Sequence, residues 1–262
     1  MTNAALHVAR TGLDAQSSRM RVIANNLANV NTTGFKRDRA EFATLAYQMV
    51  TAAGARSSAD NQYATGLNLG TGVRLTGTGR ITSPGSINTT GNNLDLAIEG
   101  EGYFQIQRPD GSTGYSRAGN FHRSAEGKLV TSDGMAVMPE IQIPENANAI
   151  TIGLDGTVSV TVAGASEAQE VGRLELARFV NPAGLQALGN NLYAETAASG
   201  SAQTGPANAE GRGAIRQGAL EASNVNVVQE LVDMIETQRA YEVNSKMIQA
   251  TDEMLRNANQ QL

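Results

Sequence analysis

The chain has 262 residues, of which 17% are charged, and a formal net charge of −5. This length suits one large domain or two smaller ones with a sizeable core. Because it contains no cysteine, disulfide scaffolds, thiolate metal sites and cysteine nucleophiles are excluded. We expect no nucleic-acid binding, because there is no basic run, and no direct membrane insertion, because no apolar stretch approaches about 18 residues. The first residues lack a signal-peptide pattern, so we expect any export to proceed without a cleaved signal.

The first thirty residues carry a pattern typical of a coiled-coil helix. Apolar side chains recur every seven positions. A second set with the same seven-residue spacing begins three positions after the first, and Gln16 is the one polar residue in it. The Asn- and Gly-containing stretch 29–34 suits a helix end. The pattern predicts a helix over about residues 3–28, with a packing face that includes Leu6, Leu13, Met20, Ile23 and Leu27.

The last forty residues repeat this pattern, with no glycine or proline in 219–262. Ser223, Asn224 and Asn226 are candidate N-caps, and Gln229 is placed as the capping-box partner of Asn226. A helix of about 34 residues would be roughly 50 Å long. Its expected packing face consists of Val227, Leu231, Met234, Tyr241, Ile248 and Leu255.

Between the two helices the apolar period changes to two and turn residues multiply. Asp-Gly pairs at 110–111, 133–134 and 155–156 are typical of hairpin turns. Short strands between such turns predict an antiparallel all-β domain. We expect residues 195–210 to form an exposed loop. The strand-like runs are 94–98, 103–107, 128–131, 150–152, 157–162 and 171–180.

The sequence therefore predicts an α+β fold, in which N- and C-terminal coiled-coil helices flank an antiparallel β domain. Either the two apolar helix faces pack against each other, or they pack against other chains. The second alternative predicts termini that become ordered only in an assembly. The expected segments are an N-terminal helix (1–35), an extended connector (36–70), a β-rich domain (71–220) and a C-terminal helix (221–262).

Candidate catalytic residues are few. Glu99 and Glu101 flank a glycine and could act as paired carboxylates on a glycoside, but a solvated turn explains them better. Ser116 lacks the spacing of a nucleophile elbow and would need His122 as its base. We expect no enzyme activity, no cofactor and no metal site.

Four stretches resemble the bacterial flagellar rod and hook proteins. The segment 24–36 (ANNLANVNTTGFK) is similar to the N-terminal signature of that family, and 221–246 is similar to its closing helix. The internal stretches 100–104 (GEGYF) and 115–121 (YSRAGNF) also match. The motif residues that carry the resemblance are Asn25, Asn26, Leu27, Asn29, Gly34, Phe35, Asn224, Arg239 and Tyr241.

The resemblance implies a structural subunit that polymerises with itself into the rod of the flagellar basal body. The length and the segment 47–72 resemble a distal rod subunit, which would transmit torque as a drive shaft across the periplasm. The implied partners are proximal rod subunits, the hook protein, periplasmic and outer-membrane ring proteins and the flagellar export apparatus. Terminal helices would form an inner tube, with the β domain outside it.

Other functions remain as alternatives. The chain could be a proximal rod or hook subunit, for which the segment 47–72 is the discriminating feature. More remote alternatives are an extracytoplasmic binding protein built on the β domain and an enzyme that acts on peptidoglycan.

Overall fold

The computed structural model describes residues 2–56, 61–162 and 168–260. The chain divides into two compact units, each built from separated stretches of sequence. One unit combines the two ends of the chain with 38–79, and the other combines 28–37 with 80–225. A helix at each end of the chain flanks mostly antiparallel β structure, so the predicted α+β fold class is confirmed.

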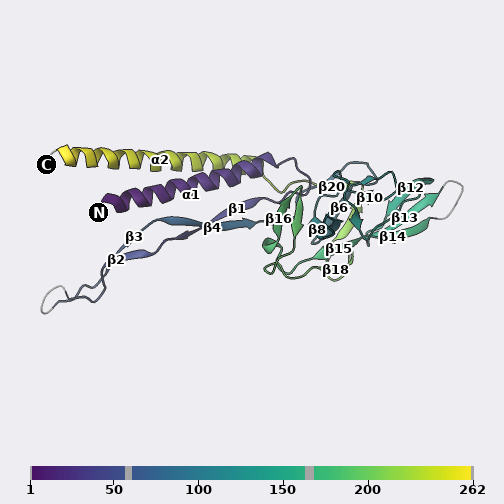
Figure 1. Cartoon of the computed structure of the whole chain (residues 1–262), viewed down its shortest axis with the longest axis horizontal. Helices are drawn as coiled ribbons and strands as arrows, with labels where there is room; N and C mark the ends of the chain where they lie inside the picture. Colours follow the sequence, from purple (N-terminus) through teal and green to yellow (C-terminus); the bar gives the residue numbers. More distant parts are fainter. Residues whose placement is uncertain (1, 57–60, 163–167, 261–262) are drawn as a thin grey trace. The chain divides into compact units, whose positions relative to one another are not determined.

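The first unit contains both helices. Helix α1 spans Thr2–Ala28, close to the predicted range, and α2 spans Val227–Gln260 over 34 residues. Their far ends, at the two termini of the chain, lie at the same end of this unit (Figure 1). The helices therefore run antiparallel.

The start of α2 follows the predicted cap in part. The side-chain oxygen of Asn226 accepts hydrogen bonds from the backbone N–H of Val228 (3.1 Å) and of Gln229 (3.3 Å). Asn226 is therefore the N-cap. The Gln229 side-chain amide donates to Asp233, and within the described part of the chain no hydrogen bond runs from the Asn226 backbone N–H to the Gln229 side chain, so the expected capping box is not formed.

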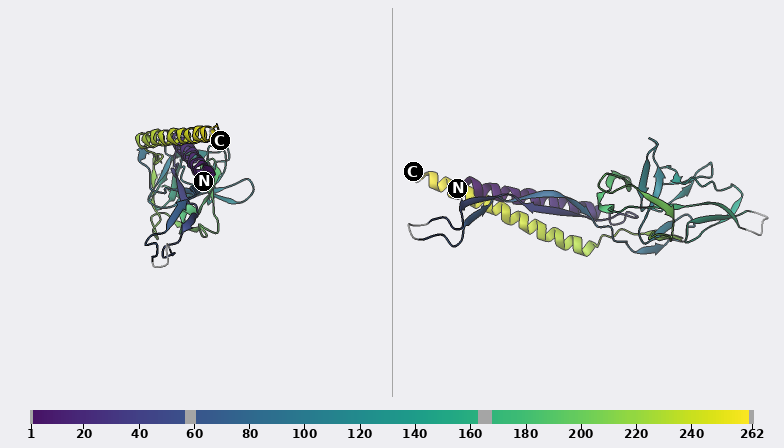
Figure 2. Two further views of the ribbon diagram at one scale, coloured as in Figure 1. Left: turned by 90° about the vertical axis from the view of Figure 1, so that its left-hand side faces the viewer. Right: turned by 90° about the horizontal axis from the view of Figure 1, so that it is seen from below.

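A ribbon of four strands completes the first unit. Strand β1 (Asp38–Thr44) pairs with β4 (Val73–Arg80), and β2 (Tyr47–Thr51) pairs antiparallel with β3 (Leu67–Gly70). The ribbon lies lengthwise beside α1 (Figures 1 and 2). The segment expected as an extended connector therefore contains three of these strands.

The second unit is built on a seven-stranded sheet. Its strand order is β16-β17-β8-β7-β15-β18, and β11 pairs with β7 beside this path. Each register described in it is antiparallel. The strands are β7 (Tyr103–Gln107), β8 (Thr113–Ser116), β11 (Val137–Met138), β15 (Glu175–Arg178), β16 (Gln186–Gly189), β17 (Leu192–Ala194) and β18 (Gln203–Pro206).

Smaller sheets surround it. A three-stranded sheet has the order β12-β13-β14, and three two-stranded sheets pair β6 with β19, β5 with β20 and β9 with β10. A short 3-10 helix, η1 (Pro182–Gly184), precedes β16. The strands are β5 (Ile87–Thr89), β6 (Leu96–Glu99), β9 (His122–Arg123), β10 (Leu129–Val130), β12 (Ala147–Ile152), β13 (Thr157–Val162), β14 (Gln169–Arg173), β19 (Ala214–Gln217) and β20 (Ala219–Glu221).

Two local predictions were wrong. The run 171–180 was expected to be one strand, but it is divided at the buried residue Leu174 between β14 and β15, which belong to different sheets. The stretch 195–210 was expected to be a loop, but it contains β18. This strand is the last in its sheet, and its first two residues, Gln203 and Thr204, are exposed and polar, so it lacks the alternation of apolar and polar residues that predicts a strand.

The core of the second unit has two parts. Aliphatic side chains from several sheets surround Phe104 and Phe121, whose rings meet edge to face. On the opposite side of β7, Tyr103 joins a second cluster with Tyr115, Phe179 and other residues. Strand β7 is thus covered on both faces, which explains its nearly continuous burial.

Candidate assembly surface

The predicted packing residues of α1 lie partly covered within the first unit. Ile23 is buried, whereas Leu6, Leu13, Met20 and Leu27 are half-buried. The four-stranded ribbon covers part of α1, as two contacts show. The Nδ1 atom of His7 lies 3.2 Å from the Thr71 carbonyl oxygen, and the Thr11 hydroxyl accepts a hydrogen bond from the backbone N–H of Val73 at 3.3 Å.

Three contacts join the two helices in antiparallel register. Near the end of α1, Asn26 donates to a Glu230 carboxylate oxygen at 3.2 Å. Farther along, Arg19 lies 3.5 Å from Asp233. At Gly12, an added Cβ would lie 3.0 Å from the Asn244 amide, so glycine permits this close approach.

The face of α2 that is covered within the chain is polar. Glu230, Thr237 and Thr251 are buried, and Asn244 is half-buried, so one polar row recurs every seven positions. The Thr237 and Thr251 hydroxyls each donate to the carbonyl four residues earlier in their own helix. Those groups are therefore satisfied without a partner helix.

The apolar side chains of α2 lie largely outside this polar row. Of the predicted face, Val227, Leu231 and Tyr241 are exposed, and Met234 and Ile248 are half-buried. Leu255 falls on α2, but its side chain is outside the part of the chain that the structure describes. Further exposed apolar residues on α2 are Val228, Val232, Ile235, Val243, Met247 and Met254.

Val228, Val232 and Ile235 lie outside the packing face that the sequence predicts. Their spacing of four and three residues is itself a helical signal, because it places them on one side of α2. Val228 is 71% exposed. Together with Leu231, these residues form what we call the outer apolar face of α2.

A buried ion network in the second unit joins three of the quoted motifs. Glu221 accepts hydrogen bonds from the Lys36 ammonium at 2.5 Å and from Arg117 Nε at 2.8 Å. All three side chains are almost completely buried. Arg117 also donates to the carbonyls of Gly100 and Gly102, each at 2.8 Å. We call Lys36, Arg117 and Glu221 the buried ion network.

Burial and charge act in opposite directions on the pKa values of this network. Burial lowers the pKa of the Lys36 ammonium below its usual value, and the hydrogen bond and charge of Glu221 offset this only in part. Burial alone would raise the pKa of Glu221, but the charges and hydrogen bonds of Arg117 and Lys36 lower it overall. The network therefore holds Glu221 as a carboxylate.

Other motif residues form hydrogen bonds in the same region of the second unit. Gly34 has a φ of +69° and donates its N–H to the Glu221 carbonyl at 2.8 Å. The Asn224 side chain accepts from the backbone N–H of Arg37 at 2.8 Å and donates to the Ile81 carbonyl at 2.9 Å. The Phe35 carbonyl accepts from the backbone N–H of Asn224 at 3.3 Å.

The remaining motif residues lie in the helices and their ends. Asn26 is buried; besides contacting Glu230, its amide exchanges two hydrogen bonds with the backbone of Asp38. Asn25 is exposed and Asn29 is half-buried. Arg239, like Tyr241, is exposed on α2.

The candidate catalytic residues are engaged in other contacts or stand apart. Glu101 forms an ion pair with Arg178 at 2.9 Å, and Glu99 ends β6. The Ser116 hydroxyl donates to the Asn191 carbonyl at 2.9 Å, while His122 is exposed on β9. Within residues 2–56, 61–162 and 168–260, no group of three acidic or histidine side chains could hold a metal ion. Among the described helices, none is long and apolar enough to cross a membrane.

Three family models match separate parts of the chain. Residues 6–36 match "Flagella basal body rod protein", residues 97–160 match "Flagellar hook protein FlgE/F/G D1 domain", and residues 216–261 match "Flagellar basal body rod FlgEFG protein C-terminal". These matches cover both helices and part of the β-rich unit. They define the class as flagellar rod and hook proteins.

Full-length relatives narrow this class. The chain is 50% identical to the flagellar basal-body rod protein FlgG of Buchnera aphidicola from Schizaphis graminum, over 97% of this chain and 98% of the relative. It is 48% identical to FlgG of Caulobacter vibrioides, over 98% of both chains, and 40% identical to FlgG of Bacillus subtilis, over 94% of both. The chain belongs to the family of flagellar basal-body rod proteins and is a structural subunit of the flagellar rod. The predicted family, structural role and location in the basal body are thereby confirmed.

Proposed function

We propose that this subunit polymerises with itself into the distal rod, the drive shaft that transmits torque from the motor to the hook. The observation that supports this proposal is the outer apolar face of α2. Apolar side chains that line one side of a long helix and remain exposed mark a surface that another chain covers. In a rod subunit, other copies of the chain would cover it.

The proposed roles of the segments follow the expected boundaries. Residues 1–35 and 221–262 would form the inner coiled-coil tube, 36–70 the connector and 71–220 the outer β-rich domain. Tyr47, Met49 and Leu67, on β2 and β3, are exposed. These side chains support a role for the connector in touching neighbouring subunits and stiffening the tube.

We further propose the partners and the absence of catalysis. The partners would be proximal rod subunits, the hook protein, the periplasmic and outer-membrane ring proteins and, during export, the flagellar export apparatus. The rod would span the periplasm. The engagement of Glu101 with Arg178 and of Ser116 with a backbone carbonyl supports a purely structural role.

The proposal is tested in a strain that lacks the gene and is supplied with variants. Val228→Ser combined with Ile235→Ser removes apolar area from the outer face without touching the polar row. We expect truncated rods, no hook or filament and no swimming, as seen by electron microscopy of isolated basal bodies and by motility assays.

The matched control is Gln238→Ser, which alters an exposed polar side chain on the same helix. It should restore complete rods. Circular dichroism of the purified double variant checks that α2 still forms. Complete rods with normal filaments in the double variant would contradict the proposed role of this face.

A further inference from the structure

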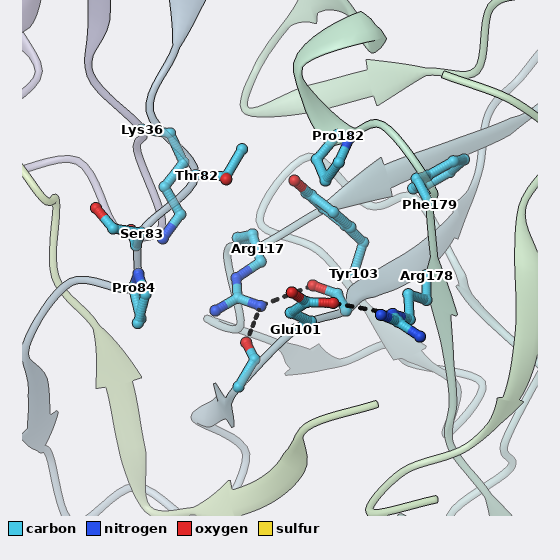
Figure 3. Close-up of a pocket in the computed structure, with 12 residues that line it drawn as sticks. Lys36, Thr82, Ser83, Pro84, Glu101, Tyr103, Arg117, Arg178, Phe179 and Pro182 are labelled. Carbon is cyan, nitrogen blue, oxygen red and sulfur yellow. Dashed lines mark hydrogen bonds and ion pairs between the residues drawn. The ribbon is translucent and has the colours of Figure 1, made fainter. Parts of the chain in front are cut away.

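A cavity of about 240 Å³ lies beside the buried ion network in the second unit (Figure 3). Lys36 and Arg117 contribute to its wall, and the Glu101–Arg178 ion pair borders it. The rest of the wall is largely apolar. Its apolar and aromatic lining residues include Pro84, Tyr103, Phe179 and Pro182.

The charges around this cavity do not cancel. Three cationic side chains line it, namely Lys36, Arg117 and Arg178, whereas Glu101 is the one acidic lining residue. The Glu221 carboxylate does not line the cavity, but it pairs with Lys36 and Arg117 and so adds one further negative charge. Three positive and two negative charges leave a net charge of +1. The cavity therefore favours a monoanion.

Tyr103 supplies an uncommitted polar group. Tyr103 as a residue is only 6% exposed, and no hydrogen bond of its hydroxyl is found in the described part of the chain. Figure 3 shows the Tyr103 side chain extending past Pro182 toward the side of the cavity that Thr82 lines. Burial raises the pKa of Tyr103 to about 12, so the hydroxyl keeps its proton at neutral pH and can donate it to an anion.

Lys36 and Arg117 also keep donor capacity. An ammonium has three N–H groups and a guanidinium has five. Within the described ranges, Lys36 donates to Glu221 and to the Ser83 carbonyl. Arg117 donates to Glu221 and to three carbonyls. One N–H of each side chain is therefore left for a further acceptor.

We propose that this cavity binds a carboxylate carried on a small apolar stem. The carboxylate would accept from the Tyr103 hydroxyl and from the spare N–H groups, and the stem would lie against Phe179 and the two prolines. A neighbouring hollow of about 350 Å³ shares Phe179 and Pro182 with the cavity, so the stem can continue past Arg178. The source of the carboxylate is either a free small molecule or an acidic side chain of a second copy of this chain.

Benzoate is the probe for this site, and benzyl alcohol is its uncharged counterpart. Each is titrated into the 15N-labelled full-length chain at neutral pH, and amide chemical shifts are recorded. We expect benzoate to produce saturable shifts at Gly102, Tyr103 and Ser83, and to bind at least about tenfold more tightly than benzyl alcohol. Shifts that do not saturate, or equal affinity for the two probes, would overturn the proposal.

Two variants test the assigned groups. Tyr103→Phe removes only the hydroxyl and should weaken benzoate binding about three- to tenfold, whereas Tyr115→Phe, outside the cavity wall, should leave it unchanged. Glu101→Gln raises the net charge of the cavity to +2 and should tighten benzoate binding without affecting benzyl alcohol. This gain cannot arise from loss of folding. Unchanged benzoate affinity in both Tyr103→Phe and Glu101→Gln would refute the site.

Self-association distinguishes the two sources. Sedimentation of the full-length chain is compared in the presence of saturating benzoate and of benzyl alcohol. Self-association that benzoate inhibits and benzyl alcohol does not would show that an acidic side chain of a second copy fills the cavity. Unchanged association, with benzoate bound, would assign the cavity to a free carboxylate. Because the chemical shifts report on the cavity itself, the binding result stands even if the proposed polymerisation is refuted.

Discussion

The ammonium nitrogen of Lys36 lies 2.5 Å from a carboxylate oxygen of Glu221, although the two residues are separated by 185 positions in sequence. Arg117 holds the other oxygen of the same carboxylate at 2.8 Å. The N-terminal, internal and C-terminal motifs of the chain thus meet at one buried carboxylate. Loss of that carboxylate would leave two buried cations without their shared anion.

We therefore expect Glu221→Gln to destabilise the second unit strongly. Removing one partner of a buried ion pair costs about 3–5 kcal/mol, because the remaining charge stays buried and unpaired. Urea unfolding followed by tyrosine fluorescence measures the loss. The control is Glu101→Gln, which removes an exposed partner of Arg178 and should cost at most about 1 kcal/mol. Equal losses in the two variants would contradict the assigned importance of the network.

The network also predicts a pH dependence. The pKa of Glu221 is lower in the folded chain than in the unfolded chain, mainly because Arg117 and Lys36 outweigh the effect of burial. Its contribution to the free energy of unfolding is therefore complete above the unfolded value of about 4.3, and is lost as pH falls through the lower folded value. Urea unfolding between neutral pH and pH 3 should show a shallower acid decline for Glu221→Gln than for the unchanged chain. Parallel declines would refute the assignment.

A second buried residue joins the elements of the first unit. Asn26 exchanges two hydrogen bonds with the Asp38 backbone and donates to Glu230. Asn26→Ala removes these three hydrogen bonds and should lower the free energy of unfolding by about 1–3 kcal/mol. Amide hydrogen exchange should show reduced protection at Asp38 and in the last turn of α1. Ser17→Ala, at an exposed position of the same helix, should leave protection there unchanged.

Local patterns were sufficient to predict the two helices, because a seven-residue repeat and the Asn226 cap depend on neighbours in sequence. They could not predict which side of α2 is covered within the chain. The covered row contains Thr237 and Asn244, and a search for apolar residues cannot detect it because these residues are polar. The Thr237 hydroxyl donates to a carbonyl of its own helix, and Asn244 fits against Gly12 of α1. The partners of Glu221 were equally inaccessible, since each lies in a separate motif and pairing depends on the folded β-rich unit.

The aromatic residues show the same limit. The chain has only five Phe, six Tyr and no Trp, yet the rings of Tyr103 and Phe179 meet edge to face with their centroids 5.8 Å apart, and the ring centroids of Phe179 and Tyr115 are 4.8 Å apart. Few aromatic rings suffice when the fold gathers them on one face of β7. Composition gives their number but not their clustering.

Exposed side chains of strands β2 and β3 should matter for assembly and not for folding. Met49 is 67% exposed, and Leu67 is also exposed. Met49→Ser combined with Leu67→Ser should change the free energy of unfolding by less than about 1 kcal/mol. In the gene-deletion strain, the same double variant should reduce the number of complete rods in electron micrographs. Normal rod numbers would show that these side chains make no contact needed for assembly.

Gly34 offers a test of the close packing around the buried ion network. A Cβ at this position would lie 2.6 Å from the Arg117 carbonyl carbon, and the φ of +69° is one that side chains disfavour. The matched control is Gly91, which has a φ of +78° but no atom within 4 Å of its added Cβ. Gly91→Ala should cost about 1–2 kcal/mol from backbone conformation alone. Gly34→Ala should cost that amount and roughly 1–3 kcal/mol more, because the backbone of Arg117 must move. Urea unfolding of both variants measures the difference, and equal costs would mean that the contact between Gly34 and Arg117 is not tight.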